Sequence, residues 1–191
     1  MAKKNKDVTD RGFDSERDLS RAFSPESCIR AEFGYKDWNS WQAPELEGLF
    51  GIPDHIAVFW RTDRLGRRVV RTFAFELKRD HWRRALMQAY RYASFADYSL
   101  VVLDNMYVHR AVAHLEEFKK SNIGLLSVRV DGKVRWHFRP HRRTPYSRHM
   151  RHLLDAALSV HLFGNKDGEP NKSMDAYVSD GASRGLKRRS S

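Results

Sequence analysis

The sequence predicts an α/β domain in which a mixed central β-sheet is flanked by helices. Short apolar or alternating runs, typical of strands, are interspersed with segments whose apolar residues recur at three- and four-residue steps, as in helices. The 191-residue chain fits one domain with tails better than two full domains, and a hydrophobic content of 41% is enough to form a core. The expected order of elements is α-β-β-β-α-β-α-β-β-α.

The globular domain is expected to span residues 13–163. Residues 1–12 are polar and basic, and we expect them to form a disordered N-terminal tail. Residues 164–191 are rich in Gly, Ser, Asp and Lys, a composition that predicts a flexible C-terminal tail.

The N-terminal part of the domain is expected to contain one helix, one strand and a structured loop. Asp14 or Ser15 can cap a short helix that extends to about Ala22. Residues 28–35 (CIRAEFGY) alternate apolar with charged side chains, which predicts a strand. Residues 36–52 contain two tryptophans, a proline and two glycines, and are expected to form a loop.

A β-hairpin followed by a helix is expected next. Residues 55–60 form a continuous apolar strand, residues 61–68 a polar turn with a glycine, and residues 69–78 the returning strand. Residues 79–97 then switch to helical spacing, with apolar side chains at four-, three- and four-residue steps from Trp82.

The remaining elements alternate between sheet and helix. Residues 98–104 predict a buried strand and residues 108–122 an amphipathic helix. Residues 123–130 and 133–140 flank an Asp-Gly turn and predict a second hairpin. Residues 147–164 predict a final helix.

The chain is strongly basic. It has 35 Lys and Arg against 24 Asp and Glu, a formal net charge of +11, which favours a polyanionic partner, with nucleic acid first and an anionic membrane surface second. Residues 129–152 contain eight Lys and Arg against one Asp, and they include Trp136, Phe138 and Tyr146. Arginine and aromatic side chains together are suited to phosphate contacts and to stacking on bases or sugars. We therefore expect nucleic acid to be the partner.

Several other classes of function are disfavoured. No apolar run approaches the roughly 20 residues of a membrane-spanning helix, and the N-terminus has no hydrophobic signal region, so neither a membrane partner nor secretion is expected. The single cysteine, Cys28, excludes an intramolecular disulfide and a cysteine-rich zinc site, and a cytoplasmic location is expected. The nine histidines lack an H-E-x-x-H pattern, and no G-x-x-x-x-G-K-[ST] loop indicates ATP use.

Asp54, Glu76 and Lys78 are the candidate catalytic residues. In a strand over residues 69–78, Glu76 and Lys78 share one face because side chains alternate. Asp54 directly precedes the strand at residues 55–60, so antiparallel pairing brings it near both. Two carboxylates at a strand end can hold Mg²⁺, which polarises a phosphoryl oxygen and lowers the pKa of a bound water. Lys78 can stabilise the charge that develops on the phosphoryl oxygens or position the attacking water.

This set of residues resembles the PD-(D/E)XK nuclease superfamily, which has a restriction-endonuclease-like core with an αβββαβ arrangement. The resemblance rests on the pair Pro53-Asp54, a spacer of 21 residues, and the triplet Glu76-Leu77-Lys78. Taken singly, Asp54 also fits a turn residue after proline, and Glu76 and Lys78 a solvated ion pair. The resemblance implies that Asp54, Glu76 and the carbonyl of Leu77 bind Mg²⁺, with Mn²⁺ as a substitute.

The resemblance continues beyond the triplet, over roughly residues 14–140. QAYRYASFADYSLVVL (residues 88–103) is similar to the Gln and Tyr motif of the family and the strand that follows it, and IGLLSVRVDGKV (residues 123–134) looks like its terminal hairpin. Gln88 and Tyr92, four residues apart on one helix face, match the residues that support the catalytic site. The resemblance implies that Gln88 orients the lysine or contacts a backbone phosphate, and that Tyr92 packs or hydrogen-bonds beside it.

Members of the family usually carry one further acid on the first helix. Glu16 matches by position and would contact the metal through water, although an acid in the first turn of a helix also interacts favourably with the helix dipole. Glu32 is the competing candidate, and Glu45 and Glu47 in the expected loop stay open as alternatives.

The expected function is therefore that of a Mg²⁺-dependent endonuclease, with DNA favoured over RNA. Many members of the family act as dimers, so a homodimer is compatible with the resemblance. A catalytically silent nucleic-acid-binding module with the same fold, and an assembly component of a phage or mobile element that packs on nucleic acid, are the alternatives. The residues expected to hold the nucleic-acid backbone are Arg79, Arg83, Arg84, Arg135, Arg139, Arg142, Arg143 and Arg148.

Overall fold

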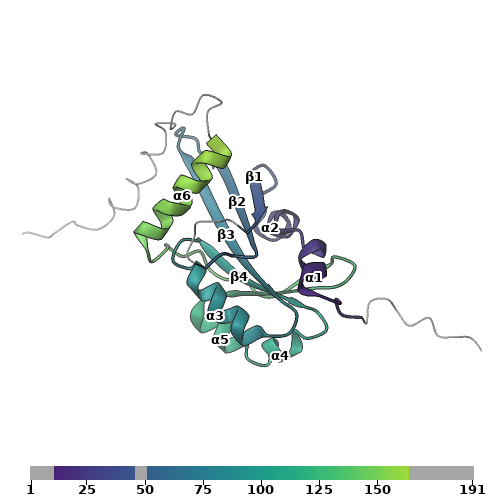
Figure 1. The fold of residues 1–191 in the computed structure, drawn as a ribbon. Coiled ribbons are helices and arrows are strands. Elements are labelled where there is room, and N and C mark those ends of the chain that lie inside the picture. The colour runs from purple at the N-terminus through teal and green to yellow at the C-terminus, as the bar shows by residue number, and fades with distance from the viewer. Residues whose placement is uncertain (1–10, 46–50, 164–191) are drawn as a thin grey trace, which may run out of the picture.

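A six-stranded mixed β-sheet forms the centre of the domain (Figure 1). The structure is a computed structural model that describes residues 11–45 and 51–163. The strands lie side by side in sequence order; the pairs β3–β4 and β4–β5 are parallel, and the other three pairs are antiparallel. The strands are β1 (Asn39–Pro44), β2 (His55–Thr62), β3 (Arg68–Lys78), β4 (Tyr98–Asp104), β5 (Gly124–Val128) and β6 (Val134–Phe138).

Helices in the described residues cover both faces of the sheet. Buried side chains from α1 and α2 pack with one face, and buried side chains from α3, α4, α5 and α6 pack with the other. The expectation of an α/β domain with a mixed central sheet flanked by helices is confirmed. The helices are α1 (Glu16–Ala22), α2 (Pro25–Phe33), α3 (Trp82–Tyr92), α4 (His109–Val112), α5 (Leu115–Ser121) and α6 (Arg148–Phe163).

The β2–β3 ladder determines which side chains meet at the edge of the sheet. It is antiparallel, as expected, and its last pair joins His55 to Phe75. Phe75 and Leu77 lie in the core beneath α1 and α2, whereas Ala74 lies in the core beneath α3. Because side chains alternate along a strand, Glu76 shares the α3 side with Ala74.

The strand predicted at residues 28–35 is wrong, because this segment belongs mainly to helix α2. Ser24 caps the helix by accepting a backbone hydrogen bond, and Pro25 occupies its first turn, where the missing N–H costs nothing. Gly34 ends the helix with a φ of 68°, in the left-handed region that favours glycine. The alternation of apolar and charged residues obscured these terminal signals.

Two further segments differ from expectation. The segment at residues 36–52, expected to be a loop, contains β1, which pairs with β2 along its whole length and ends at Pro44, a position at which an edge strand tolerates proline. The helix expected at residues 108–122 is divided into α4 and α5. His114, at the point of division, stacks its ring on Trp82 of α3, with ring centroids 4.8 Å apart.

The other elements lie where they were predicted, within a few residues at their ends. The tails expected at residues 1–12 and 164–191 fall outside the described residues, apart from Arg11 and Gly12. Over the described ranges, none of the helices has the length and apolar character that crossing a bilayer requires.

Candidate active site

Asp54 is held at the end of β3 by a backbone hydrogen bond. If the register of β2 and β3 is continued by one residue beyond the pair His55–Phe75, Asp54 lies opposite Glu76. The Oδ2 atom of Asp54 accepts a hydrogen bond from the backbone N–H of Leu77 at 2.6 Å. The carboxylate of Asp54 is therefore fixed beside the strand that carries Glu76.

Glu76 is a buried carboxylate whose two oxygens have different surroundings. Its side chain is 1% exposed, and Oε2 accepts a hydrogen bond from the hydroxyl of Tyr92. Oε1 lies 3.0 Å from Nζ of Lys78 as an ion pair, but it accepts no hydrogen bond of good geometry. Burial raises the pKa of Glu76, although the hydrogen bond from Tyr92 acts in the opposite direction.

Lys78 is a single cation placed among three carboxylates. Its Nζ lies 3.0 Å from Glu76, 3.3 Å from Oε2 of Glu16 and 3.8 Å from Oδ2 of Asp54, and it donates a hydrogen bond to the carbonyl of Leu77 at 2.9 Å. Burial lowers the pKa of Lys78, but the contacts with Glu76, Asp54 and Glu16 outweigh burial, so the pKa is raised. Lys78 is therefore charged at neutral pH.

Four glutamates were considered from the sequence as the further acid of the site, and Glu16 is the one whose carboxylate contacts Lys78. Glu32 instead forms an ion pair with Arg139 at 3.6 Å. The backbone N–H of Glu45 donates to the carbonyl of Asp54 at 3.4 Å, and Glu47 lies outside the described residues.

Helix α1 is anchored so that Glu16 faces the end of β3. Leu19 is fully buried in the core, and the side chain of Ser15 caps the helix by accepting a backbone hydrogen bond. One turn after Glu16, the hydroxyl of Ser20 lies 2.7 Å from Nε2 of His55, the residue next to Asp54 in the chain. This contact joins α1 to the start of β2.

Tyr92 and Gln88 lie one turn apart on α3, on the side that packs against β3. The hydroxyl of Tyr92 is also 3.1 Å from the carbonyl of Ile52. Burial and the contact with Glu76 raise the pKa of Tyr92, so it stays a hydrogen-bond donor. The Oε1 atom of Gln88 is buried without a hydrogen-bond partner, and within the described residues no hydrogen bond joins Gln88 to Lys78.

The donors at this site fit Mg²⁺, provided that water completes the coordination. Asp54 and Glu76 offer hard carboxylate oxygens, and Oε1 of Glu76 is a buried acceptor without a hydrogen bond. Across the described part of the chain, no group of three or more His, Cys, Asp and Glu side chains could hold an ion unaided. Mg²⁺ commonly binds through one or two carboxylates and keeps several waters, so the oxygens of Asp54 and Glu76 are of the kind that it takes.

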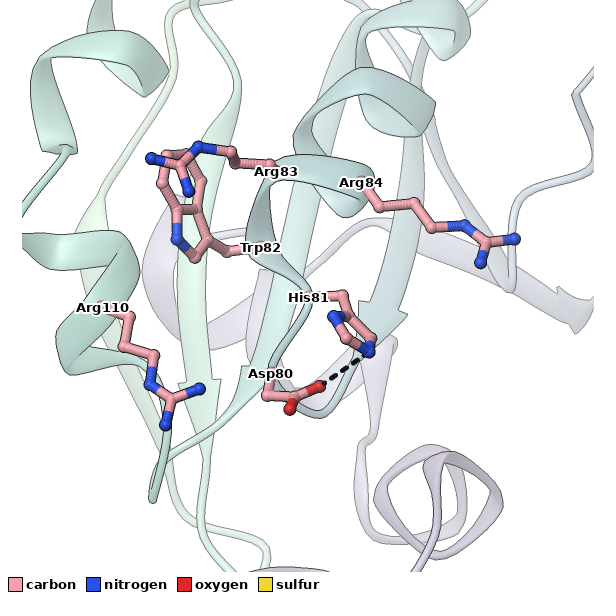
Figure 2. Close-up of a pocket in the computed structure, with 6 residues that line it drawn as sticks. All are labelled: Asp80, His81, Trp82, Arg83, Arg84 and Arg110. Atoms are coloured by element: carbon pink, nitrogen blue, oxygen red, sulfur yellow. Dashed lines mark ion pairs between the residues drawn. The ribbon is translucent and has the colours of Figure 1, made fainter.

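A basic cavity lies at the connection between β3 and α3, and its lining begins two residues after Lys78 in the chain (Figure 2). It has a volume of about 450 Å³, and its one acidic residue, Asp80, is paired with His81 at 3.5 Å. The guanidinium of Arg83 lies 4.5 Å from the centre of the Trp82 ring. The cavity is lined by Asp80, His81, Trp82, Arg83, Arg84 and Arg110.

Arg110 was not among the residues expected from the sequence. It reaches the cavity from α4, whereas Arg83 and Arg84 come from the first turn of α3 (Figure 2). In the sequence, the one feature that could have indicated Arg110 was its position near the start of the helix expected at residues 108–122. Arg79, which was expected, donates to the backbone carbonyl of Asp14 at 2.9 Å and so helps to hold the segment before α1.

The arginines expected in residues 129–152 do not form one surface with this cavity. Arg142 donates to the buried carboxylate of Asp97 at 3.1 Å, and Arg143 donates to the last carbonyls of α5. Asp97 precedes β4, at the end of the parallel strands opposite to Lys78. Arg139 contacts α2 through Glu32, and Arg135 and Arg148 are exposed on β6 and α6.

No family model, curated protein or solved structure matches this chain. The chemistry of the cluster formed by Glu16, Asp54, Glu76 and Lys78 therefore follows from the charges and distances of these side chains alone. Three carboxylates surround one ammonium group there, and a buried carboxylate oxygen lacks a hydrogen bond. An arrangement with excess negative charge attracts a divalent cation, and a cation next to a protonated lysine attracts a phosphate.

Proposed function

We propose that the chain is a Mg²⁺-dependent nuclease that hydrolyses phosphodiester bonds, with DNA as the favoured substrate. The observation that carries this proposal is the meeting of Asp54, Glu76 and Lys78 at two adjacent strand ends, where one ammonium group lies among three carboxylates.

The order of elements supports a restriction-endonuclease-like core of the PD-(D/E)XK type. A helical segment is followed by three antiparallel strands, then by α3, and then by β4, which is parallel to β3. This order resembles the αβββαβ arrangement that the resemblance implies, with two helices, α1 and α2, before the first strand. Tyr92 on α3 supports it further, because its hydroxyl binds the glutamate of the Glu-x-Lys triplet.

Each residue of the cluster has a distinct task in the proposed mechanism. Asp54, Glu76 and the carbonyl of Leu77 would hold Mg²⁺, and Glu16 would reach it through water. The bound ion would supply Lewis-acid chemistry, by polarising a phosphoryl oxygen and acidifying a water. Lys78, whose pKa is raised by its contacts with Glu76, Asp54 and Glu16, would stabilise negative charge on the phosphoryl oxygens or position the attacking water.

The substrate would approach from the side of the basic cavity. Three arginines line this cavity: Arg83 and Arg84, which follow Lys78 by a few residues, and Arg110 on α4. They can contact the phosphates next to the one that is cleaved. Such contacts release counterions and make binding weaken steeply as salt is raised.

The test is an assay of cleavage on supercoiled plasmid, linear duplex, single-stranded and branched DNA, with Mg²⁺ or with EDTA. Cleavage should require Mg²⁺, and Asp54→Asn, Glu76→Gln and Lys78→Met should each lower the rate by about 10²-fold or more. Asn at position 54 can still accept the hydrogen bond from Leu77, so that variant removes charge with little effect on the fold. Asp37→Asn, at an exposed residue between α2 and β1, is the matched control.

Two outcomes would overturn the proposal. The first is cleavage that persists in EDTA or in the three site variants, because the cluster would then not be the catalytic site. The second is wild-type protein that binds DNA but cleaves none of the four substrates, which would favour the catalytically silent binding module.

A further inference from the structure

Two exposed tyrosines lie next to each other on the outer side of α3. Tyr90 is 51% exposed, and Tyr146, in the segment before α6, is 61% exposed. Their ring centroids are 6.4 Å apart, and their planes are inclined by 32°. Aromatic side chains bury much of their surface in most folds, so two neighbouring rings that both face solvent indicate a surface for binding.

The segment that carries Tyr146 is fixed to α3 through the backbone. The N–H of Tyr146 donates to the carbonyl of Ala93 at 3.3 Å, and the N–H of Ser147 donates to the carbonyl of Ser94 at 3.2 Å. The hydroxyl of Tyr146 is 3.5 Å from the carbonyl of Arg91. The segment and the ring of Tyr146 are therefore held against the end of α3 before any ligand binds, which reduces the entropic cost of binding.

Positive charge and apolar area surround the rings. Arg91 is exposed beside Tyr90, and the half-buried Arg143 lies near both tyrosines. Met87, one turn before Arg91, is 64% exposed. We call Met87, Tyr90, Arg91, Arg143 and Tyr146 the tyrosine surface; none of these residues is acidic.

The tyrosine surface adjoins the candidate active site. A Cβ at Gly51 would lie 3.5 Å from Cε1 of Tyr92 and 3.8 Å from Cβ of Arg91, so the segment before Asp54 touches both residues. Tyr92 points inward to Glu76 while the tyrosine surface faces outward. The exposed Ile52 follows Gly51 in the chain, and its carbonyl lies 3.1 Å from the hydroxyl of Tyr92. A strand that leaves the site over this segment would meet the tyrosine surface.

We propose that the tyrosine surface stacks unpaired bases, and that the substrate is single-stranded nucleic acid or the unpaired part of a frayed or branched one. In a duplex the faces of the bases are covered by their neighbours, whereas an unpaired base offers its face to an aromatic ring. The arginines match the charge of a phosphate backbone and favour a polyanion over an apolar protein partner. The statement about the substrate rests on the proposed nuclease function; the binding of unpaired bases does not.

The test is the affinity of the full chain for a 20-nucleotide single strand and for a duplex of the same sequence, measured by fluorescence anisotropy in EDTA. Tyr90→Ala and Tyr146→Ala should each weaken single-strand binding by about tenfold, and should change duplex binding less than twofold. Tyr90→Phe and Tyr146→Phe should bind as wild type, because phenylalanine keeps the ring. Leu65→Ala, at a 75% exposed residue in the β2–β3 turn, is the control for loss of exposed apolar area.

Salt titrations separate stacking from charge. The alanine variants should keep the wild-type slope of log affinity against log salt, because no phosphate contact is lost, whereas Arg91→Ala should lower the slope by about 0.7 on the single strand. The inference would be overturned if the tyrosine-to-alanine variants lost the same affinity for single strand and for duplex, or lost none for either. The second result would indicate that the tyrosine surface binds a protein instead. Tyrosine-dependent binding without any Mg²⁺-dependent cleavage would support the inference and overturn the proposed nuclease.

Discussion

The hydroxyl of Tyr92 on α3 donates a hydrogen bond to the carboxylate of Glu76 on β3. Both residues are 1% exposed, so the bond lies in the interior. It joins the strand that carries two of the three candidate catalytic residues to the helix that covers it. It also holds Oε2 of Glu76 in place and leaves Oε1 as the oxygen near Lys78.

Tyr92→Phe should therefore destabilise the protein. Removing the hydroxyl leaves Oε2 of Glu76 buried without a donor, which costs about 1–3 kcal/mol. The free energy of unfolding, measured by urea denaturation, should fall by that amount with an unchanged m-value. Tyr90→Phe, on the same helix but exposed, should be neutral, and equal losses in the two variants would contradict the role assigned to the bond.

The core of the site was predictable from the sequence because it follows from local rules. Alternation along β3 places Glu76 and Lys78 on one face, and hairpin pairing brings Asp54 opposite Glu76. Tyr92, which was selected through the resemblance to the nuclease family, lies on the side of α3 that faces β3 and hydrogen-bonds to Glu76.

The arginines were less predictable, because their partners are distant in sequence. The buried carboxylate of Asp97 accepts hydrogen bonds from Thr72, Arg142 and Arg151, so two cations of the basic stretch hold the fold together. Arg110 reaches the cavity only because α4 packs next to α3. The density of positive charge along the chain does not show which arginines form ion pairs with buried carboxylates and which have a guanidinium that can contact a ligand.

Mg²⁺ should stabilise the folded protein. Asp54, Glu76 and Glu16 share one cation, Lys78, and a divalent ion would relieve their repulsion. A ligand that binds only the folded state stabilises it by about 2.7 kcal/mol at a free concentration of 100 Kd. The melting temperature, followed by circular dichroism at constant ionic strength, should therefore rise with Mg²⁺.

Variants locate the ion. Glu76→Gln should abolish the Mg²⁺-dependent rise in melting temperature, because it removes one of the two carboxylates proposed to bind the ion. Asp37→Asn, at an exposed acid remote from the cluster, should keep it. The same rise in both variants would mean that Mg²⁺ binds elsewhere.

The basic cavity should contribute phosphate contacts. Arg83→Ala, Arg84→Ala and Arg110→Ala should each weaken binding to duplex DNA, and each lost phosphate contact should lower the slope of log affinity against log salt by about 0.9. The slope is measured by anisotropy between low and moderate salt in EDTA. Arg64→Ala, at an exposed arginine in the β2–β3 turn, removes the same charge away from the cavity and should leave the slope unchanged. A lower slope for Arg64→Ala as well would point to diffuse attraction by the net charge.

His137 should make stability depend on pH on the acidic side of neutrality. Its Nε2 lies 2.9 Å from the hydroxyl of Ser127, and burial, followed by the charge of Arg135, lowers its pKa. Between this lowered pKa and the unfolded value of about 6.5, the unfolded chain binds more protons, so stability rises with pH across that window. The contribution is complete above the unfolded pKa and is lost as pH falls through the folded one.

His137→Gln should flatten this dependence, since an amide can still pair with Ser127 but does not titrate. The free energy of unfolding, measured by urea denaturation from pH 7.5 to 5.5, should fall less in the variant than in wild type. Some slope should persist in both, because burial also lowers the pKa of His55. His141→Gln controls for the removal of an exposed histidine. If His137→Gln and wild type lost stability in parallel, His137 would not be the group whose protonation opposes folding.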